Sequence, residues 1–281
     1  MADEPQTEAN QERYTHGYGV ASQVMATRSA GRQAGFFLPH LRTGMSLLDC
    51  GCGPGTITLG LAEALAPGEV VGIDIGAGEI ERATTIASEQ GVANVRFEVA
   101  NSYQLPFADS TFDAVFAHTL LEHLVEPDKA LSEMLRVLRT GGVIGVRDSD
   151  WGGVVISPHD EAVLNFFKVR EQVWRLNGGD PRLGRRLAAM LRAAGFNRVQ
   201  TTASYNMYGN FENAEHFGGV ENIGEFFARY AELPQFTERA QEHGYADAEE
   251  LRGFAKASRS WGRHPDALWA YSNFEALGWK A

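Results

Sequence analysis

Between residues 46 and 146 the sequence alternates short apolar runs with segments of helical periodicity. The apolar runs have the length and composition of buried strands and lie at 46–50, 70–74, 95–99, 112–117 and 143–146. Helical patterns separate several of them, at 56–65, at 79–90 and from Pro127 to the Gly141-Gly142 pair, which we expect to end that helix. Strands that alternate with helices pair in parallel, with helices on both faces. The alternation therefore predicts a right-handed α/β fold.

The same periodicities organise the rest of the chain. Apolar residues at helical spacing predict a helix over 28–41. After the fifth strand we expect helices and strands at 160–176, 182–194, 196–202, 214–261 and 267–274. The chain is thus predicted to comprise an N-terminal helical lid, an α/β core, a helical substrate lid and a final core strand, over residues 1–43, 44–204, 205–265 and 266–281.

Composition narrows the possible partners. Of the 281 residues 44% are hydrophobic and 22% charged, as in a globular protein with a sizeable core. The net charge of −11 disfavours binding to nucleic acid and to anionic membranes. No apolar stretch approaches the about 18 residues of a membrane span, and the acidic start lacks the apolar segment of a secretory signal. With only Cys50 and Cys52, a reducing cytoplasm is the expected location.

The turn between the first strand and the first helix is rich in glycine. It reads Asp49-Cys50-Gly51-Cys52-Gly53-Pro54-Gly55-Thr56. Glycines allow a ligand to contact the backbone, and such a turn lies at the carboxyl edge of a parallel sheet, where ligands bind. A dinucleotide is one candidate, but its G-x-G-x-x-G fingerprint requires glycine where Thr56 stands. The chain contains no G-x-x-x-x-G-K-[ST] phosphate loop.

Two further segments end at the same edge. Asp74 ends the second strand, where a carboxylate can accept hydrogen bonds from both hydroxyls of a ribose; a helix-capping role is the alternative. The loop at 100–107 follows the third strand and can offer Asn101 and backbone N–H groups to an adenine edge, although an ordinary polar loop would look the same. Together the three segments favour a nucleoside site.

These segments, in this order, resemble the class I S-adenosylmethionine-dependent methyltransferases, in particular the ubiquinone/menaquinone C-methyltransferase-like branch. The resemblance covers roughly residues 36–199. It includes Leu105-Pro106-Phe107, Ser110-Thr111-Phe112-Asp113, and the segment from Glu126-Pro127-Asp128 to Gly141-Gly142. It implies a Rossmann-like sheet of seven mostly parallel strands, with the last strand antiparallel, and helical N-terminal and C-terminal lid segments.

The resemblance also implies roles at individual positions, with S-adenosylmethionine as cofactor and S-adenosylhomocysteine as product. Gly51 and Gly53 would line the methionine half, and Asp49 and Cys52 would be further cofactor-binding positions. Asp74 would bind the ribose, Ile75 would lie against the adenine, and Asn101 and Ser102 would meet its edge. His118 would lie beneath the sulfonium. Asn101 departs from the family's usual aspartate, which keeps an acceptor but removes a charge. His118 stands where a small residue is common.

Other residues are candidates for the lid and the acceptor site. In enzymes of this type the N-terminal segment commonly folds over the cofactor, so Tyr14 and Arg28 are predicted to bind it, with Arg28 at the methionine carboxylate; helix packing and a solvated arginine are the alternative. The candidate general bases are His118 and His16, and His123, Asp148 and Asp150 are further candidates near the expected mouth of the site. The acceptor is predicted to contact Tyr18, His123, Asp150 and Trp151. Neither Glu122-His123 nor Cys50-x-Cys52 extends to a metal-binding motif, so no metal site is predicted.

The predicted function is transfer of a methyl group to a small molecule. Aromatic residues are concentrated between Tyr205 and Trp279, which favours an apolar or aromatic acceptor, although helical insertions also need cores and the same surface could pair subunits as a homodimer. Whether carbon, nitrogen or oxygen accepts the methyl group stays open, because acceptor specificity depends on variable lids. The alternatives are a non-catalytic nucleoside-binding protein and a nicotinamide-dependent oxidoreductase.

Overall fold

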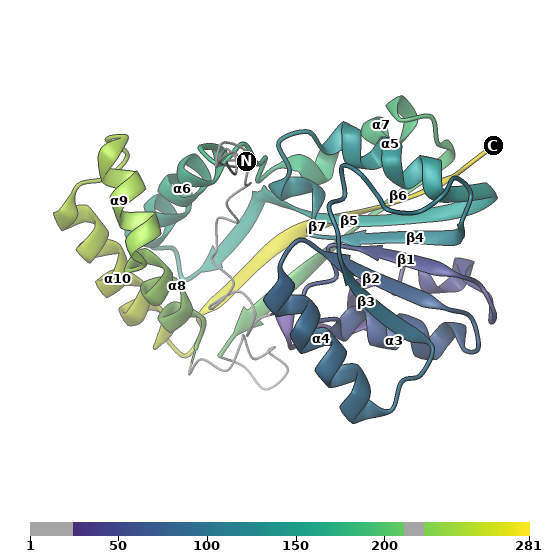
Figure 1. Cartoon of the computed structure of the whole chain (residues 1–281). Helices are drawn as coiled ribbons and strands as arrows, with labels where there is room; N and C mark the ends of the chain where they lie inside the picture. The colour runs from purple at the N-terminus through teal and green to yellow at the C-terminus, as the bar shows by residue number, and fades with distance from the viewer. Residues whose placement is uncertain (1–24, 211–221) are drawn as a thin grey trace, which may run out of the picture.

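The computed structural model describes residues 25–210 and 222–281, which form a seven-stranded sheet (Figure 1). The strand order is β3-β2-β1-β4-β5-β7-β6. Strands β1 to β5 pair in parallel, whereas β7 is antiparallel to both neighbours. This confirms the predicted sheet and its antiparallel last strand. The strands are β1 Leu47–Cys50, β2 Val70–Asp74, β3 Val95–Val99, β4 Phe112–His118, β5 Leu138–Ser157, β6 Asn197–Gly209 and β7 Leu268–Trp279.

The helices follow the predicted pattern in the core and differ from it at two places. The described helices are α2 Ala30–Gln33, α3 Thr56–Leu65, α4 Ala77–Gln90, α5 Pro127–Val137, α6 Glu161–Arg175, α7 Leu187–Ala193, α8 Ile223–Ala231, α9 Pro234–Glu242 and α10 Ala248–Gly262, with the 3-10 turns η2 Leu38–His40, η3 Leu121–His123 and η4 Leu183–Arg186. The continuous helix predicted over 28–41 is wrong: glycines at 31 and 35 weaken it, and only α2 and η2 form. Gly141-Gly142 lies inside β5 and does not end α5. Among the described residues no helix is both long and apolar enough to cross a membrane.

Apolar side chains fill both faces of the sheet. On one face Leu47 and Phe116 pack against Phe37 and against Leu61 of α3. On the other face Leu48 and Val115 pack beneath α5 and α7, in a cluster that includes Leu131 and Leu187. Figure 1 shows α3 and α4 on one side of the sheet and α5 and α7 on the other. Helices on both faces explain why the strand patterns are continuously apolar.

Strands β5, β6 and β7 are much longer than predicted. β5 has 20 residues and β6 has 13, whereas the sequence predicted strands over 143–146 and 196–202. The extra residues extend past the ends of β1 to β4, and α6, α8, α9 and α10 lie beside this extension (Figure 1). Charged and glycine residues over 147–153 do not show the apolar pattern of a strand, although most of them are buried. The extension therefore has no simple signal in the sequence.

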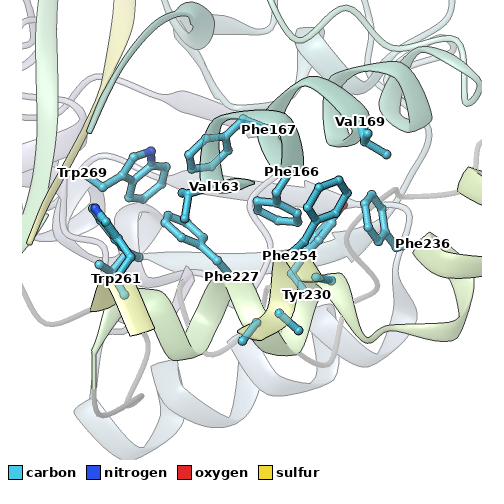
Figure 2. Close-up of a cluster of buried hydrophobic side chains, with 14 of the residues drawn as sticks. Val163, Phe166, Phe167, Val169, Phe227, Tyr230, Phe236, Phe254, Trp261 and Trp269 are labelled. Carbon is cyan, nitrogen blue, oxygen red and sulfur yellow. The ribbon is translucent and has the colours of Figure 1, made fainter. Parts of the chain in front are cut away.

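The helices beside the extension share an aromatic core (Figure 2). The rings of Phe167 and Phe227 meet edge to face at 4.9 Å, and Phe227 meets Trp269 at 5.0 Å. Phe227 is 1% exposed and Trp269 2%. Such rings contribute mainly by packing against one another, so much of the aromatic content after Tyr205 builds a core and is not a ligand-facing surface.

Gly55 joins the turn after β1 to α3, and a side chain at this position would test how tightly the turn packs against β3 and α4. Its φ is +79°, and an added Cβ would lie 2.8 Å from Cζ of Phe97 and 2.9 Å from Cβ of Ala83. Left-handed backbone and overpacking both oppose a side chain, so we expect Gly55→Ala to lower the free energy of unfolding by about 2–4 kcal/mol. Urea denaturation measures this loss. The control is Gly91→Ala, where φ is +67° but nothing lies within 4 Å; its expected loss is about 1 kcal/mol. Equal losses in the two variants would contradict the packing argument.

Candidate functional site

The carboxyl ends of β1 to β4 border a cleft that is partly open to solvent. The structure brings together in it all the predicted cofactor-binding residues that it describes: Arg28, Asp49, Gly51, Cys52, Gly53, Asp74, Ile75, Asn101, Ser102 and His118. His123 also lines it. Tyr14, His16 and Tyr18 lie outside the described residues. Convergence of loops at this edge follows from parallel strand pairing, because every parallel strand ends there.

Asp74 lies at the end of β2 and holds two backbone turns. Its Oδ2 accepts a hydrogen bond from the Gly53 N–H at 3.0 Å, and its Oδ1 accepts one from the Gly76 N–H at 2.8 Å. Burial raises the pKa of this carboxyl above its usual value, and the backbone N–H groups oppose that shift. The carboxylate therefore connects the glycine turn after β1 to the cleft wall formed after β2.

Asp49 lies in β1 and is buried, with 2% of its surface exposed. Its Oδ2 accepts a hydrogen bond from Thr58 Oγ1 at 2.6 Å. Burial is the largest effect on this carboxyl and raises its pKa to about 7. The Thr58 hydrogen bond lowers the pKa, and the neighbouring Asp74 raises it. Near neutral pH the group is thus divided between its neutral and charged forms.

This raised pKa makes the stability of the protein depend on pH. In the unfolded chain Asp49 titrates near 3.8 and in the folded protein near 7, so the stabilisation is complete below about pH 4 and is lost as the pH rises through 7. The loss is on the order of 4 kcal/mol. We expect Asp49→Asn to flatten the fall in unfolding free energy between pH 5 and pH 8, measured by urea denaturation.

The control for this pH dependence is Asp113→Asn. Burial raises the Asp113 pKa, but hydrogen bonds from Ser46 and Arg139 outweigh burial and lower it overall, so Asp113 titrates below pH 5. This variant should keep the wild-type slope between pH 5 and pH 8. If Asp49→Asn kept that slope as well, the assignment to Asp49 would be refuted.

The rim of the cleft after β2 and β3 combines apolar and polar groups. Ile75 is 58% exposed, which is unusual for an isoleucine beside a cleft. Asn101 Oδ1 accepts a hydrogen bond from the Tyr103 N–H at 2.9 Å, which fixes the loop that also presents Ser102. An exposed apolar side chain facing a polar loop suits a flat heteroaromatic ring with polar edges.

His118 ends β4 and is buried between two arginines. Nη1 of Arg147 lies 2.8 Å from its Nε2, and Nη1 of Arg28 lies 3.5 Å from its Nδ1. A guanidinium only donates, so the shorter contact, from Arg147, makes Nε2 the acceptor and leaves the proton on Nδ1. Nδ1 then faces Thr119 Oγ1 at 3.3 Å, and Arg28 donates to the same Thr119 oxygen and not to the ring. Burial first, and then the charges of Arg28 and Arg147, hold the pKa of His118 well below its usual value. A neutral ring whose basic nitrogen is already engaged does not suit the general-base role predicted for it.

His123 lines the cleft from η3. Its ring stacks on Trp174 with centroids 4.8 Å apart, and its Nε2 lies 3.6 Å from Glu122 Oε1. Burial first, and then the positive charges of Arg170 and Arg28, lower the pKa of His123 to about 3. His123 is therefore neutral at physiological pH. Its placement allows contact with a ligand in the cleft, whereas its stacking also orders the surrounding wall.

Asp150 and Trp151, predicted to contact the acceptor, are not among the residues that line the cleft. Asp150 is buried and accepts two hydrogen bonds from Arg185, at 2.5 and 2.6 Å. Trp151 stacks on Tyr271 with centroids 5.3 Å apart and lies beneath the guanidinium of Arg170 at 3.9 Å. The Asp150 carboxylate therefore serves an ion pair, and Trp151 belongs to the aromatic core.

Several residues line the cleft that the sequence had not indicated as site residues: Met25, Pro54, Thr56, Ile57, Ile73, Ala100, Thr119, Leu120 and Leu124. Thr119 directly follows β4 and has a φ of +49°, a costly conformation for a β-branched residue. The sequence did contain a signal that Thr119 lines the cleft, because the residue stands directly after a predicted parallel strand. No signal in the sequence indicated that Arg28 and Arg147 flank His118, because Arg147 reaches the ring from the neighbouring strand β5.

Known proteins match the part of the chain that builds this cleft. The family described as "Methyltransferase domain" matches residues 41–180. O-methyltransferase rstn1 of Aspergillus nomiae is 32% identical over 181 residues, covering 63% of this chain and 75% of that protein. "Probable methyltransferase ltbC" of Aspergillus luteorubrus is 39% identical over 146 residues, which are 48% of this chain. That match spans 51% of ltbC, so the chain covers about half the length of this curated relative.

A solved structure agrees at the level of the fold. The YcgJ protein of Bacillus subtilis superposes with a TM-score of 0.59 at 20% identity, covering 88% of this chain and 97% of that one. The seven-stranded sheet with an antiparallel last strand and the glycine turn beside Asp74 are those expected from the sequence, and the structure adds the strand order, with β7 between β5 and β6. Together with the match to three quarters of rstn1, they show that the chain belongs to the class I S-adenosylmethionine-dependent methyltransferases.

Proposed function

We propose that this protein transfers a methyl group from S-adenosylmethionine to a small apolar or aromatic molecule. The observation that carries the proposal is the cleft itself. It places the Asp74 carboxylate beside the glycine turn and within the same wall as an exposed isoleucine and a polar loop. A carboxylate for a ribose, an apolar surface for a purine and a turn without side chains are the three contacts that this cofactor needs.

The glycine turn fits an elongated ligand. A Cβ added at Gly51 would lie 3.0 Å from Cδ1 of Leu120, and one added at Gly53 would lie 3.3 Å from Sδ of Met25. Leu120 and Met25 also line the cleft, so side chains at 51 and 53 would narrow it. We assign Gly51, Gly53, Cys52 and Asp49 to the methionine half, Asp74 to the ribose, Ile75 to the adenine face, and Asn101 and Ser102 to the adenine edge.

Arg28 is assigned to the methionine carboxylate. It lines the cleft, and its Nη1 donates to Thr119 Oγ1 at 3.1 Å, so its charge is held at the end of β4. A guanidinium can bind a carboxylate through two parallel hydrogen bonds. His118, neutral and held by Arg147, positions Arg28 and Thr119 and is not assigned a proton-transfer role.

When bound, S-adenosylmethionine supplies a sulfonium methyl group for in-line displacement by a nucleophile of the acceptor, with S-adenosylhomocysteine and, for a protonated nucleophile, a proton as the other products. The chain's own contribution is orientation, which for well-placed reactants is worth about 7–11 kcal/mol. Arg28, Asp74 and the glycine turn hold one reactant at the sheet edge. We propose that residues 1–43 and 205–265 act as lids that shape the acceptor site.

Two measurements on the purified full chain test the proposal. Calorimetry should show saturable binding of S-adenosylhomocysteine and much weaker binding of NAD. With S-adenosylmethionine and a panel of phenols, quinones and amines, S-adenosylhomocysteine should accumulate in proportion to methylated product. Binding without turnover of any acceptor would favour a nucleoside-binding protein, and preference for NAD would favour an oxidoreductase.

A further inference from the structure

On the sheet face that carries His118, three strands present polar side chains in register. β5, β7 and β6 align Arg147 with Glu275 and Thr202, then Ser149 with Asn273 and Ser204, and β7 and β6 next align Tyr271 with Asn206. Asn273 is at the centre of this arrangement, because cross-strand neighbours share a face and so do residues two apart along a strand. We call this group the β7 polar patch.

Asn273 is the one member of the patch whose side chain has no hydrogen bond in the described structure. It is 0% exposed, and neither Oδ1 nor Nδ2 has a partner. Its cross-strand neighbours are engaged elsewhere: the Ser149 hydroxyl donates to Glu122, and the Ser204 hydroxyl donates to Glu275. Each buried polar group left unsatisfied costs about 1–3 kcal/mol, so an amide with both ends unpaired is an unfavourable core residue.

A hydrogen-bonded bridge spans Asn273. Nη2 of Arg147 donates to Asn206 Oδ1 at 3.0 Å, and Nδ2 of Asn206 donates to the Tyr271 hydroxyl at 2.9 Å. Arg147 and Asn206 occupy opposite corners of the patch, so the line between them passes over Asn273. A ligand would reach the Asn273 amide only if Arg147 and Asn206 moved apart, because Asn273 is 0% exposed.

The charges of the patch are balanced. The Arg147 guanidinium pairs with Glu275 at 3.3 Å, and Glu275 also accepts from Thr202 and Ser204. Asp148 and Asp150 alternate with Arg147 and Ser149 along β5 and so point to the opposite face. A ligand cation would find no unpaired carboxylate here and a ligand anion would compete with Glu275, so the patch suits a neutral polar group.

We infer that Asn273 binds the methyl acceptor, through a neutral group of the acceptor that carries a hydrogen-bond donor and acceptor side by side, as a lactam or an amide does. The inference rests on the proposed function. An asparagine amide presents the complementary pair of atoms in one plane. Two strand spacings and two residues separate Asn273 from His118, about 12 Å. The bound group is therefore remote from the methyl donor, and Asn273 determines specificity and takes no part in the bond change.

The first test uses 2-quinolone, a flat lactam, and 1-methyl-2-quinolone, which lacks the N–H. Each is titrated by calorimetry into the full chain loaded with S-adenosylhomocysteine. We expect 2-quinolone to bind and the methylated compound to bind at least tenfold more weakly, which is the effect of one hydrogen bond to a buried group. Failure of 2-quinolone to bind, or equal binding of both compounds, would overturn the inference.

The second test compares Asn273→Leu with Ser258→Ala. Ser258 Oγ is also buried without a partner but lies in α10, away from the patch. Both variants should keep the wild-type unfolding temperature or raise it, since each removes unsatisfied groups. Only Asn273→Leu should weaken 2-quinolone, by at least tenfold, with S-adenosylhomocysteine affinity kept within twofold.

Two outcomes separate this inference from the proposed function. Unchanged 2-quinolone affinity in Asn273→Leu, with an altered unfolding temperature, would mean that only an internal water satisfies Asn273, and the inference would fail alone. If wild-type protein did not bind S-adenosylhomocysteine, the proposed function would fail first. The quinolone titrations repeated without that ligand would then still report on Asn273.

Discussion

Replacing Asp74 by alanine is expected to lower the affinity for S-adenosylhomocysteine by about a hundredfold or more. The proposed contact is a pair of hydrogen bonds from the ribose hydroxyls to a carboxylate, and each bond to a charged group is worth about 1.5–3 kcal/mol. The substitution also releases the Gly53 and Gly76 N–H groups, which loosens the glycine turn that we assign to the methionine half. Calorimetric titration of the wild-type and variant proteins measures the change.

The unfolding temperature of this variant should fall modestly, because the Gly53 and Gly76 N–H groups lose their acceptor, while burial already disfavours the charged form of Asp74. Glu63→Ala, which removes an exposed carboxylate from α3, controls for the loss of one negative charge and should leave the affinity unchanged. Asp74→Asn keeps one acceptor oxygen and should fall between the wild type and Asp74→Ala. Wild-type affinity in Asp74→Ala would remove the ribose assignment.

Replacing Arg147 by methionine is expected to destabilise the fold by about 3–5 kcal/mol. The guanidinium is 2% exposed and links three strands: it lies 2.8 Å from His118 Nε2 on β4, 3.3 Å from Glu275 on β7 and 3.0 Å from Asn206 on β6. Methionine fills most of the volume but leaves the Glu275 carboxylate buried without its counter-charge, which is the costly element. Urea denaturation at pH 7 measures the loss.

The double variant Arg147→Met/Glu275→Gln identifies the cause. A neutral amide in place of the carboxylate removes the uncompensated charge, so most of the lost stability should return. If the double variant is as unstable as, or less stable than, Arg147→Met alone, the loss arises from packing or from the other hydrogen bonds of the guanidinium. Arg139→Met, which breaks a pair whose arginine is 47% exposed, should cost less than about 1 kcal/mol.

The core of the fold was predictable because its signals are local. Strands β1 and β2 are short apolar runs, and α3 begins and ends where the sequence indicates, after the glycine turn and before Pro67-Gly68. The long extensions of β5 and β6 were missed because their stability comes from neighbours. Arg147, Asp148 and Asp150 read as loop residues, yet each is buried in β5 by contacts with other elements.

The candidate site likewise contains residues whose position was predictable from the sequence and residues whose position was not. The cleft residues Gly51, Asp74 and Asn101 each lie at or just past the carboxyl end of a parallel strand, so topology alone brings them to one edge. Asp150 also follows the apolar part of a strand, but its side chain points to the face where η4 supplies Arg185. Which face a side chain occupies depends on register, and a register cannot be derived where the strand itself is not recognised.

The pairing of β6 with β7 runs without interruption from Gln200 opposite Leu277 to Gly209 opposite Leu268. That ladder begins at the level where β1 and β4 end beside the cleft, and it ends next to α10, where the following Asn210 donates to the Gly262 carbonyl. A hinge between two such regions requires a few backbone residues free to change φ and ψ, and a paired strand provides none. The helices α8 and α10 therefore move with the sheet when the sheet twists. A substitution that makes the sheet more rigid also reduces the motion of these helices.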